Sequence, residues 1–322
     1  MGLGKVLVSM PMRPEYKERF EQAVPGAQVT FARFEELNET QLAAFDAVVG
    51  NPDMDILSRM KGLKLLQLIS SGVAKDYMKL EESHPGLVLC SASGAFGHAI
   101  SEHMVAALMT LLKRLHEYRD GMKTGAWESR GAVRSPKGMT VLIVGAGSIG
   151  SAFGKLMQGL GSKTIGLRRK AGGDRDGFDE VYTIDELEAL LPQADVVALS
   201  LPETPQTVNL MDTRRFSLMK EGSYLLNVGR GSAVDQDALL NALREGRLAG
   251  ASIDVTTPEP LPRDHPLWRE TNLLLTPHVS GFYHLKETHD SVVEIACANL
   301  AAWPDGPLVS RVDYKTGYRA KE

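Results

Sequence analysis

The segment VLIVGAGSIG, residues 141–150, limits the possible folds of this chain more than any other stretch. An apolar run leads directly into three glycines, Gly145, Gly147 and Gly150, in G-x-G-x-x-G spacing. A stretch with helical spacing of apolar residues follows, and a second apolar run comes at 163–168. A buried strand that turns tightly into a helix, with another strand after it, is typical of a parallel α/β sheet.

Each glycine of this turn has a physical reason in a dinucleotide site. The first allows the tight turn, the second lets the backbone approach a pyrophosphate, and the third lets helix and strand pack closely. The helix begins at Ser148 and Ile149, where unpaired N–H groups and a partial positive charge face the phosphates. We therefore expect a bound dinucleotide here, and the alternative is a purely structural glycine turn.

Apolar runs alternate with amphipathic stretches along the chain, which predicts the α/β class with doubly wound parallel sheets. The predicted strands form two series, separated by a long helix: 5–10, 28–34, 45–50, 63–70 and 87–92, then 140–145, 163–168, 195–201, 223–229, 250–255 and 272–278.

The two series of strands predict two domains, a number that suits a chain of 322 residues. We expect a dinucleotide-binding Rossmann domain over 99–284, inserted in a flavodoxin-like substrate-binding domain made of 1–98 and 285–322. One uninterrupted helix over 98–121 follows the first crossing, and an amphipathic helix within 284–303 follows the second.

Local signals mark several helices. Thr183 and Glu186 have the spacing of a capping box, and Gly246 is placed to end the helix before it. The helix after the glycine turn is expected to bury one face, made of Ile149, Phe153, Leu156, Met157 and Leu160.

Composition excludes several classes of function. The net charge of −4 argues against a nucleic-acid surface, and no apolar run approaches the length of about 20 residues that a membrane helix needs. Cys90 and Cys297 lie in apolar surroundings that predict buried free thiols, and no His, Cys or Asp cluster has metal-ligand spacing. The N-terminus lacks the pattern of a signal peptide. We expect a cytoplasmic protein without a metal.

The residues after the second strand of the cofactor domain indicate which dinucleotide binds. A site for NAD usually has Asp or Glu there, to hold the ribose 2′-hydroxyl. This chain has Arg168, Arg169 and Lys170 instead. Arginine can hold a 2′-phosphate with paired, charge-assisted hydrogen bonds, whereas a carboxylate would repel it. The pattern favours NADP(H), and the alternative is a solvated basic loop.

Three polar residues follow predicted strands in the second half: Arg230 in NVGRG, Glu259 in TTPEP and His278 in TPHVSG. The carboxyl ends of parallel strands face the ligand crevice, so these side chains are expected to converge. Arginine suits a substrate carboxylate, histidine suits proton donation to a carbonyl, and the carboxylate would orient the histidine. Taken singly, Arg230 would belong to a structural ion pair, Glu259 would be a rigid loop acid, and His278 would be a core histidine.

In these segments the chain resembles the D-isomer-specific 2-hydroxyacid dehydrogenase family. The similarity runs through MTVLIVGAGSIG, ADVVALSLPETPQTVNLMD, SYLLNVGRGSAVD, GASIDVTTPEP and NLLLTPHVSG, and more loosely through LLQLISSGVAKDY in the first third. The resemblance implies a reductase that uses NADPH to convert a small 2-keto acid, glyoxylate or hydroxypyruvate above all, to the D-2-hydroxy acid. It also implies a homodimer.

The resemblance further implies residue roles. Arg230 binds and polarises the substrate, His278 is the acid/base, and Glu259 is its partner. Backbone amides near Ser71 and Gly72 hold the substrate carboxylate, and Asp254 contacts the nicotinamide carboxamide. The implied cofactor site comprises Gly145, Gly147, Ser148, Ile149, Gly150, Arg168, Arg169, Leu201, Pro202, Thr207, Val228, Gly229, Asp254, His278, Ser280 and Gly281.

Departures from the family pattern leave alternatives open. Gly229 stands where alanine is common, and SSGVAK replaces a more glycine-rich segment. Met54, Phe282 and Tyr283 would suit a partly apolar substrate pocket.

Two alternative functions remain open for this chain. One is a nucleotide-sensing, corepressor-like binding module, and the other is a dehydrogenase that works in the oxidative direction.

Overall fold

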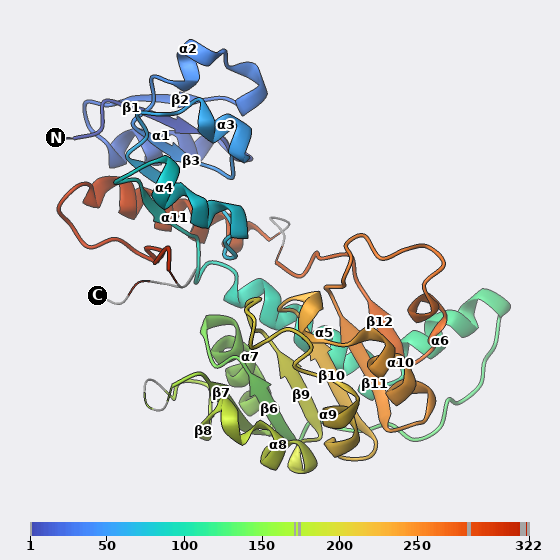
Figure 1. The fold of residues 1–322 in the computed structure, drawn as a ribbon. Helices are drawn as coiled ribbons and strands as arrows, with labels where there is room; N and C mark the ends of the chain where they lie inside the picture. Colours follow the sequence, from blue (N-terminus) through green and yellow to red (C-terminus); the bar gives the residue numbers. More distant parts are fainter. Residues whose placement is uncertain (1, 171, 173–174, 282–284, 316–319, 321–322) are drawn as a thin grey trace. The chain divides into compact units, whose positions relative to one another are not determined.

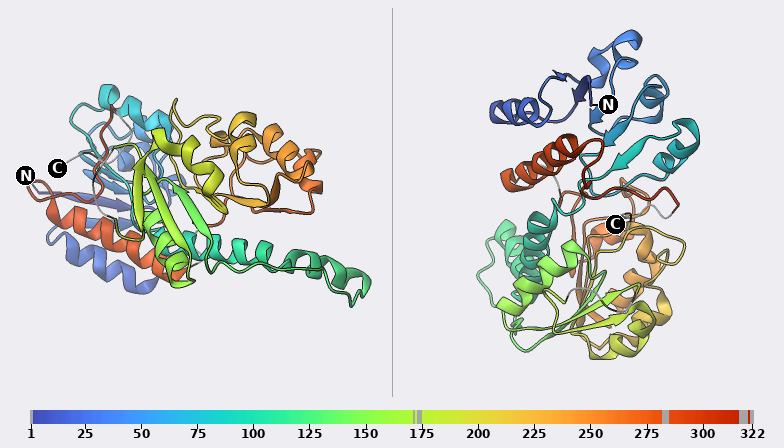
Figure 2. Two further views of the ribbon diagram at one scale, coloured as in Figure 1. Left: turned by 90° about the horizontal axis from the view of Figure 1, so that it is seen from below. Right: turned by 90° about the vertical axis from the view of Figure 1, so that its left-hand side faces the viewer.

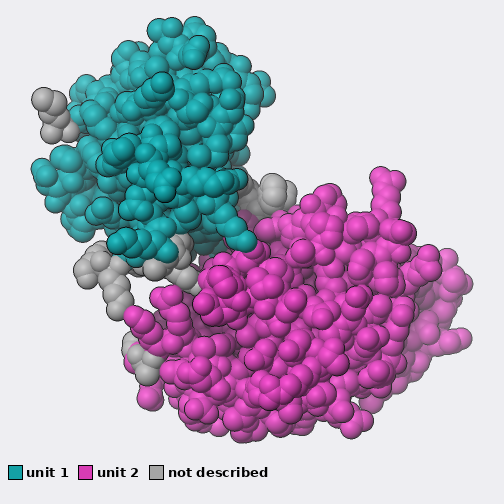
Figure 3. Space-filling model, viewed as in Figure 1, with its two compact units in different colours: residues 1–96, 283–322 teal, residues 97–282 magenta. Residues whose placement is uncertain are grey.

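The computed structural model describes residues 2–170, 172, 175–281, 285–315 and 320 (Figure 1). Residues 1–96 and 283–322 form one compact unit, unit 1, and residues 97–282 form another, unit 2 (Figure 3). Each unit has its own parallel sheet and its own apolar core. The predicted fold class, two doubly wound α/β domains with a Rossmann domain inserted in a flavodoxin-like one, is confirmed.

The sheet of unit 1 has the strand order β2-β1-β3-β4-β5, and all its pairs are parallel. This is the flavodoxin-like order, in which ligands bind beyond the carboxyl ends of the strands. The strands are β1 (Lys5–Val8), β2 (Gln28–Phe31), β3 (Ala47–Val49), β4 (Leu65–Gln67) and β5 (Val88–Cys90). The helices are α1 (Pro14–Ala23), η1 (Phe34–Glu36), α2 (Glu39–Leu42), α3 (Met54–Ser58), η2 (Lys75–Lys79), α4 (Leu80–Ser83) and α11 (Lys286–Ala302).

The sheet of unit 2 has the order β12-β11-β10-β9-β6-β7-β8, again fully parallel. The order reverses between β6 and β9, and this is the switch point at which Rossmann sheets bind dinucleotides. The strands are β6 (Thr140–Val144), β7 (Lys163–Arg168), β8 (Glu180–Thr183), β9 (Val196–Leu199), β10 (Ser223–Asn227), β11 (Leu248–Ile253) and β12 (Leu273–Leu275).

Helices cover both faces of this sheet (Figure 1). Along β6 the side chains alternate: Leu142 and Val144 join the core cluster that also contains residues of α8, α9 and α10, whereas Ile143 packs against α7. The helices of unit 2 are α5 (Gly97–Leu112), α6 (Leu115–Gly121), η3 (Met122–Thr124), α7 (Ser148–Gly159), η4 (Ile184–Glu186), α8 (Leu187–Leu190), η5 (Leu191–Gln193), α9 (Thr213–Leu218), η6 (Gly231–Ala233), α10 (Gln236–Arg244) and η7 (Pro266–Arg269).

The long helix predicted over 98–121 is interrupted. Helix α5 ends at Leu112 and α6 begins at Leu115, because Arg114 between them has a left-handed φ of +57°. The Arg114 guanidinium makes two hydrogen bonds to Glu117 in the first turn of α6, at 2.8 and 3.0 Å. Helical periodicity alone could not reveal this break, since arginine is an ordinary helix residue.

Other local predictions differ from the structure. Strand β8 was not predicted, and Thr183 caps η4 without any side-chain hydrogen bond, so the predicted capping box does not form. In α7 the buried apolar side chains are Phe153 and Met157, while Leu156 and Leu160 are each 38% exposed. Two glycines complete the buried face of α7 instead of these leucines: Gly150 and Gly154 pack closely against neighbouring segments. The predicted end of α10 is confirmed, with Gly246 just beyond it at φ +73°.

A buried aspartate fixes the amino-terminal edge of the unit 2 sheet. Asp195, directly before β9, accepts a hydrogen bond from the Thr140 N–H at the start of β6, at 3.0 Å, and from Lys220 and Arg134 at 2.7 and 3.1 Å. Burial alone would raise the pKa of the Asp195 carboxyl, but these hydrogen bonds and the two cations lower it. The carboxylate therefore ties β6, β9 and the chain that returns from α6 together.

Candidate active site

The glycine turn between β6 and α7 is shaped as the spacing predicts. Gly145 has φ +113°, and a Cβ on it would lie 2.9 Å from the Ser200 carbonyl oxygen. A Cβ on Gly150 would lie 2.2 Å from the Gly145 oxygen, so only glycine lets α7 pack this closely. A Cβ on Gly147, in contrast, would meet nothing within 4 Å. The open space at Gly147, beside the first turn of α7, fits a pyrophosphate.

The end of β7 places basic side chains where the dinucleotide ribose is expected. Arg168 is the last residue of β7, and its guanidinium donates a 2.7 Å hydrogen bond to the Gly172 carbonyl. Arg168 is half-buried, and Arg169 and Lys170 are exposed. This is the position at which a carboxylate would contact the 2′-hydroxyl of NAD.

The loop after β9 closes on itself beside the glycine turn. The Thr207 hydroxyl donates to the Pro202 carbonyl at 2.8 Å and accepts from the Thr204 N–H at 2.8 Å. Ser200 links this loop to the turn by donating to the Gly145 carbonyl at 2.9 Å. The predicted cofactor residues Leu201, Pro202 and Thr207 thus share one small rigid loop. Val228, also predicted, follows β10, and its N–H bonds to the Leu199 carbonyl at 3.1 Å.

Arg230 stands between two glycines because its neighbours pack against two other loops. A Cβ on Gly229 would lie 2.6 Å from the Leu201 oxygen, and a Cβ on Gly231 would lie 2.1 Å from backbone atoms of Thr256. Asn227, the buried last residue of β10, accepts from the Gly229 N–H and donates to the Arg230 carbonyl, each at 3.0 Å. These contacts fix the backbone from which the arginine projects.

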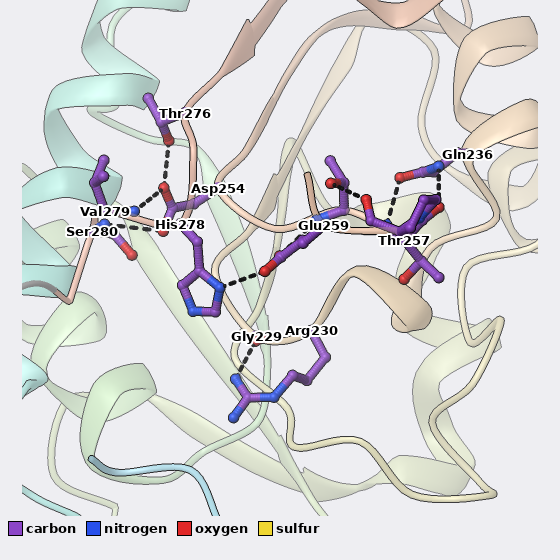
Figure 4. A network of polar contacts seen from close by, with 12 residues as sticks. Gly229, Arg230, Gln236, Asp254, Thr257, Glu259, Thr276, His278, Val279 and Ser280 are labelled. Carbon is purple, nitrogen blue, oxygen red and sulfur yellow. Dashed lines mark hydrogen bonds and ion pairs between the residues drawn. The ribbon is translucent and has the colours of Figure 1, made fainter. Parts of the chain in front are cut away.

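The guanidinium of Arg230 has little to bind within the described part of unit 2. Its one hydrogen bond to a described residue goes to the Gly229 carbonyl, at 2.7 Å, and no ion pair with a described carboxylate forms. Figure 4 shows the side chain extending to the side of the site on which the His278 ring lies. A half-buried cation without an anionic partner among the described residues is suited to an anionic ligand.

The structure brings the predicted pair His278 and Glu259 together. Nδ1 of the His278 ring lies 2.8 Å from the Glu259 carboxylate (Figure 4), and the two side chains are 52% and 39% exposed. The second oxygen of Glu259 accepts from the Thr256 N–H at 3.1 Å. Because Nδ1 faces the carboxylate, Nε2 is the ring nitrogen left to exchange a proton with a substrate.

Asp254 holds the backbone beneath His278. Its buried carboxylate accepts from the Thr276 hydroxyl at 2.6 Å and from the N–H groups of Val279 and Ser280 at 3.0 Å each. The His278 N–H donates to the Asp254 carbonyl at 2.8 Å, and His278 itself has a left-handed φ of +53°. Sequence reasoning assigned Asp254 and Ser280 to the cofactor, and the structure adds this contact with the histidine loop.

The predicted carboxylate-binding residues lie in unit 1, after β4. Ser71 and Gly72 are half-buried, and the Ser70 hydroxyl donates to the Gly72 carbonyl at 2.8 Å. Met54, at the start of α3, is half-buried as well. Phe282 and Tyr283, predicted for the substrate pocket, lie outside the described residues.

Sequence reasoning missed two residues that support this site. Asn227 is a polar residue at the end of an apolar strand, and this signal could have revealed it. Gln236 bonds through its side chain to the loop of Glu259, and a surface glutamine at the start of a helix carries no such signal.

No group of three or more His, Cys, Asp or Glu in the described residues could hold a metal ion. None of the helices described has the combined length and apolarity that a membrane crossing requires.

Comparison with known proteins identifies the family. The sequence profile "D-isomer specific 2-hydroxyacid dehydrogenase, NAD binding domain" matches residues 105–280. The chain belongs to the D-isomer-specific 2-hydroxyacid dehydrogenase family. It is therefore an NAD(P)-dependent oxidoreductase that acts on the CH–OH group of 2-hydroxy acids, as predicted.

Individual relatives agree with this assignment. The chain is 30% identical to a glyoxylate reductase of Thermofilum pendens over 262 residues, 80% of this chain and 76% of the relative. It is 29% identical to a glyoxylate reductase of Thermococcus litoralis over 270 residues, 81% and 80% of the two chains. The crystal structure of a family member from Aeromonas salmonicida is similar with a TM-score of 0.85 and 32% identity, and covers 97% of this chain and 99% of its own.

Proposed function

We propose that this dehydrogenase reduces a small 2-keto acid to the D-2-hydroxy acid with NADPH, with glyoxylate or hydroxypyruvate as favoured substrates. The observation that carries the reaction type is the His278–Glu259 pair beside an arginine that has no carboxylate partner among the described residues. The two relatives named glyoxylate reductase support the substrate class. A small keto acid offers the carboxylate and the carbonyl that such a site recognises.

The bound nicotinamide supplies the hydride, and residues of this chain supply the rest of the chemistry. Arg230 binds the keto acid through charge-assisted hydrogen bonds and polarises its carbonyl. His278 gives the proton on Nε2 to the carbonyl oxygen, which becomes the hydroxyl. Glu259 accepts from Nδ1 and so holds the ring in the required orientation.

The direct test is the initial rate of NADPH and NADH oxidation by the purified protein with 2-keto acids from glyoxylate to phenylpyruvate. We expect turnover, fastest with glyoxylate or hydroxypyruvate and faster with NADPH than with NADH. Tight cofactor binding without turnover on any keto acid would instead favour a nucleotide-sensing module. Faster turnover of 2-hydroxy acids with NADP⁺ would favour the oxidative direction.

The preference for NADPH is proposed to depend on Arg168 and Arg169. Replacing both by alanine should raise the KM for NADPH at least about 100-fold, because each charge-assisted hydrogen bond contributes roughly 1.5–3 kcal/mol and about 1.4 kcal/mol corresponds to a factor of ten. The KM for NADH should change little. Lys170→Ala is the matched control, since it removes a neighbouring exposed charge from the same loop. An equal rise of both KM values would contradict the role of a 2′-phosphate.

We also propose a homodimer. Large apolar side chains are exposed in one stretch of unit 2, from α6 through the connection after it: Leu115, Tyr118, Met122, Trp127 and Val133. The Trp127 side chain is fully exposed, and α6 with its connection extends away from the sheet (Figure 2). Exposed aromatic and aliphatic side chains in such a stretch are typical of an interface, and a second copy is the partner that the family resemblance implies.

Sedimentation velocity tests this assembly. We expect the protein to sediment as a dimer of its 35.1 kDa chain at micromolar concentration. Replacing Met122 and Trp127 by serine should give a folded monomer, because both side chains are exposed and support no core. The equivalent control is Trp268→Ser, which removes a half-exposed tryptophan elsewhere in unit 2 and should leave the dimer intact. A monomeric wild type would reject the proposal.

A reducing, cytoplasmic setting is proposed from the cysteines. Cys90 and Cys297 are free. Burial raises the pKa of the Cys90 thiol to about 12 and that of Cys297 to about 11, so both stay protonated and inert. Cell fractionation would test this setting, and recovery of the protein outside the cytoplasm would contradict it.

A further inference from the structure

The loop that carries Glu259 has little packing of its own. Residues 257–260 follow β11, and all are exposed. The Glu259 carboxylate nevertheless makes two directed hydrogen bonds, to the His278 ring and to the Thr256 N–H. An exposed loop keeps a carboxylate in one orientation only if other groups restrain its backbone.

Gln236, the first residue of α10, supplies that restraint (Figure 4). Its side-chain Nε2 donates to the Thr257 carbonyl at 2.8 Å, and its Oε1 accepts from the Thr257 N–H at 3.0 Å. Both polar backbone groups of Thr257 are thus bound by one amide. Two hydrogen bonds to the same residue fix the direction of its backbone as well as its distance from α10.

Neighbouring contacts make the restraint effective. The Thr256 hydroxyl donates to the Pro258 carbonyl at 2.9 Å, which closes the loop around Thr257. On the other side, Gly231 is packed against the Thr256 backbone so closely that a Cβ would lie 2.1 Å from it. The segment from Gly231 to Gln236 therefore holds Thr256 and Thr257 at two points. Thr256 is the residue whose N–H binds Glu259.

We propose that Gln236 is a positioning residue for the Glu259–His278 pair. It acts through Thr257 and the loop backbone, because both hydrogen bonds of its side chain go to Thr257. By holding the loop, it keeps the Glu259 carboxylate on Nδ1 of His278 and so keeps Nε2 directed at the substrate carbonyl. This role rests on the proposed function of the pair.

Gln236→Leu removes both hydrogen bonds and keeps the side-chain size. We expect kcat to fall about 3- to 10-fold with an unchanged KM for the keto acid, within the range of coupling between contacting groups. The loss should fall on kcat and not on KM, because a loosened carboxylate holds the ring less firmly in the orientation that proton transfer needs. Gln236→Glu keeps the acceptor for the Thr257 N–H and should show a smaller loss.

The matched control is Gln193→Leu. Gln193 is an exposed glutamine of unit 2 whose Nε2 also bonds a backbone carbonyl, that of Ala189, at 3.1 Å. This variant measures the general effect of losing such a bond, and it should leave kcat and KM unchanged. Glu259→Gln provides the second comparison: Gln236→Leu should cause no further loss of kcat in that background.

NMR of the His278 ring supplies a readout that does not need catalysis. The Nδ1–H signal of the ring reports its hydrogen bond to Glu259; it should shift or broaden in Gln236→Leu and in Glu259→Gln, and should not change in Gln193→Leu. His278 is flanked by Glu259, by Arg230 and by the Asp254 carboxylate beneath its backbone, and Gln236→Leu alters none of these groups.

The outcomes separate the two proposals. A lower kcat, a changed Nδ1–H signal and no additional effect in Glu259→Gln support the positioning role. Lower thermal stability alone, or an equal loss of kcat in the Glu259→Gln background, overturns it. If the wild type reduces no keto acid, the proposed function fails, and the Nδ1–H signal of His278 in Gln236→Leu still decides the role of Gln236.

Discussion

We expect the replacement of His278 with glutamine to lower kcat for 2-keto acid reduction by about 10²- to 10⁴-fold, the usual contribution of a general acid, which is the role proposed for His278. Glutamine preserves hydrogen bonding to Glu259 but cannot donate a proton to the developing alkoxide. Since the backbone of this residue is held by Asp254, the loop should keep its conformation. Stopped-flow measurement of NADPH oxidation under single-turnover conditions isolates the chemical step.

The control for this variant is His265→Gln. His265 lies in the same unit, between the Glu259 loop and β12, and accepts a hydrogen bond from the Leu267 N–H at 3.3 Å. It should retain kcat within about twofold, as expected for a residue outside the reaction. If His278→Gln kept a kcat near that of the wild type, the proton would have to come from another group.

We expect the replacement of Arg230 with lysine to lower kcat/KM by about 10²- to 10³-fold, even though the positive charge is retained. The loss follows from geometry, because lysine cannot present the planar pair of donors that binds a carboxylate or carbonyl oxygen side by side. The fold should persist, since the guanidinium's one hydrogen bond to a described residue is to the adjacent Gly229 carbonyl. Circular dichroism and the melting temperature check that point.

Chemical rescue sharpens the test of Arg230. Added guanidinium ion should restore part of the activity of Arg230→Ala, whereas methylammonium should restore less. Arg244→Lys serves as control, because Arg244 forms an ion pair with Glu270 at 2.8 Å and faces no predicted site residue. Full activity of Arg230→Lys would show that a point charge suffices and that binding of the substrate does not need the paired N–H donors of a guanidinium.

Much of the fold could be predicted from short-range patterns. Strands buried on both faces appear as continuous apolar runs, and glycines recur where the backbone turns or packs closely. The turn at Gly145, Gly147 and Gly150 shows this well, because the same three positions explain the φ of +113°, the open space and the close helix contact. Strand β8 was missed because it is a short edge strand that alternates polar and apolar residues.

The break in the predicted long helix shows where such patterns fail. Arg114 has the helical periodicity of its neighbours on both sides, and its left-handed backbone is visible only in three dimensions. In this left-handed conformation Arg114 forms an ion pair with Glu117, and the chain turns toward Leu115, where α6 begins. Local propensity cannot predict an outcome that contacts along the folded chain decide.

The sequence by itself determined the parallel α/β class, the two series of strands, and the residue types at the strand ends: Arg230, Glu259 and His278. These features are local, because burial and turn geometry act on neighbouring residues. Only the tertiary structure decided that His278 meets Glu259 across 19 positions in the chain, and that Gly229 and Gly231 serve close contacts with Leu201 and Thr256. It also placed Gln236 on the loop of Glu259. Such pairings depend on which strand ends adjoin in the sheet, and that order is a property of the packed molecule.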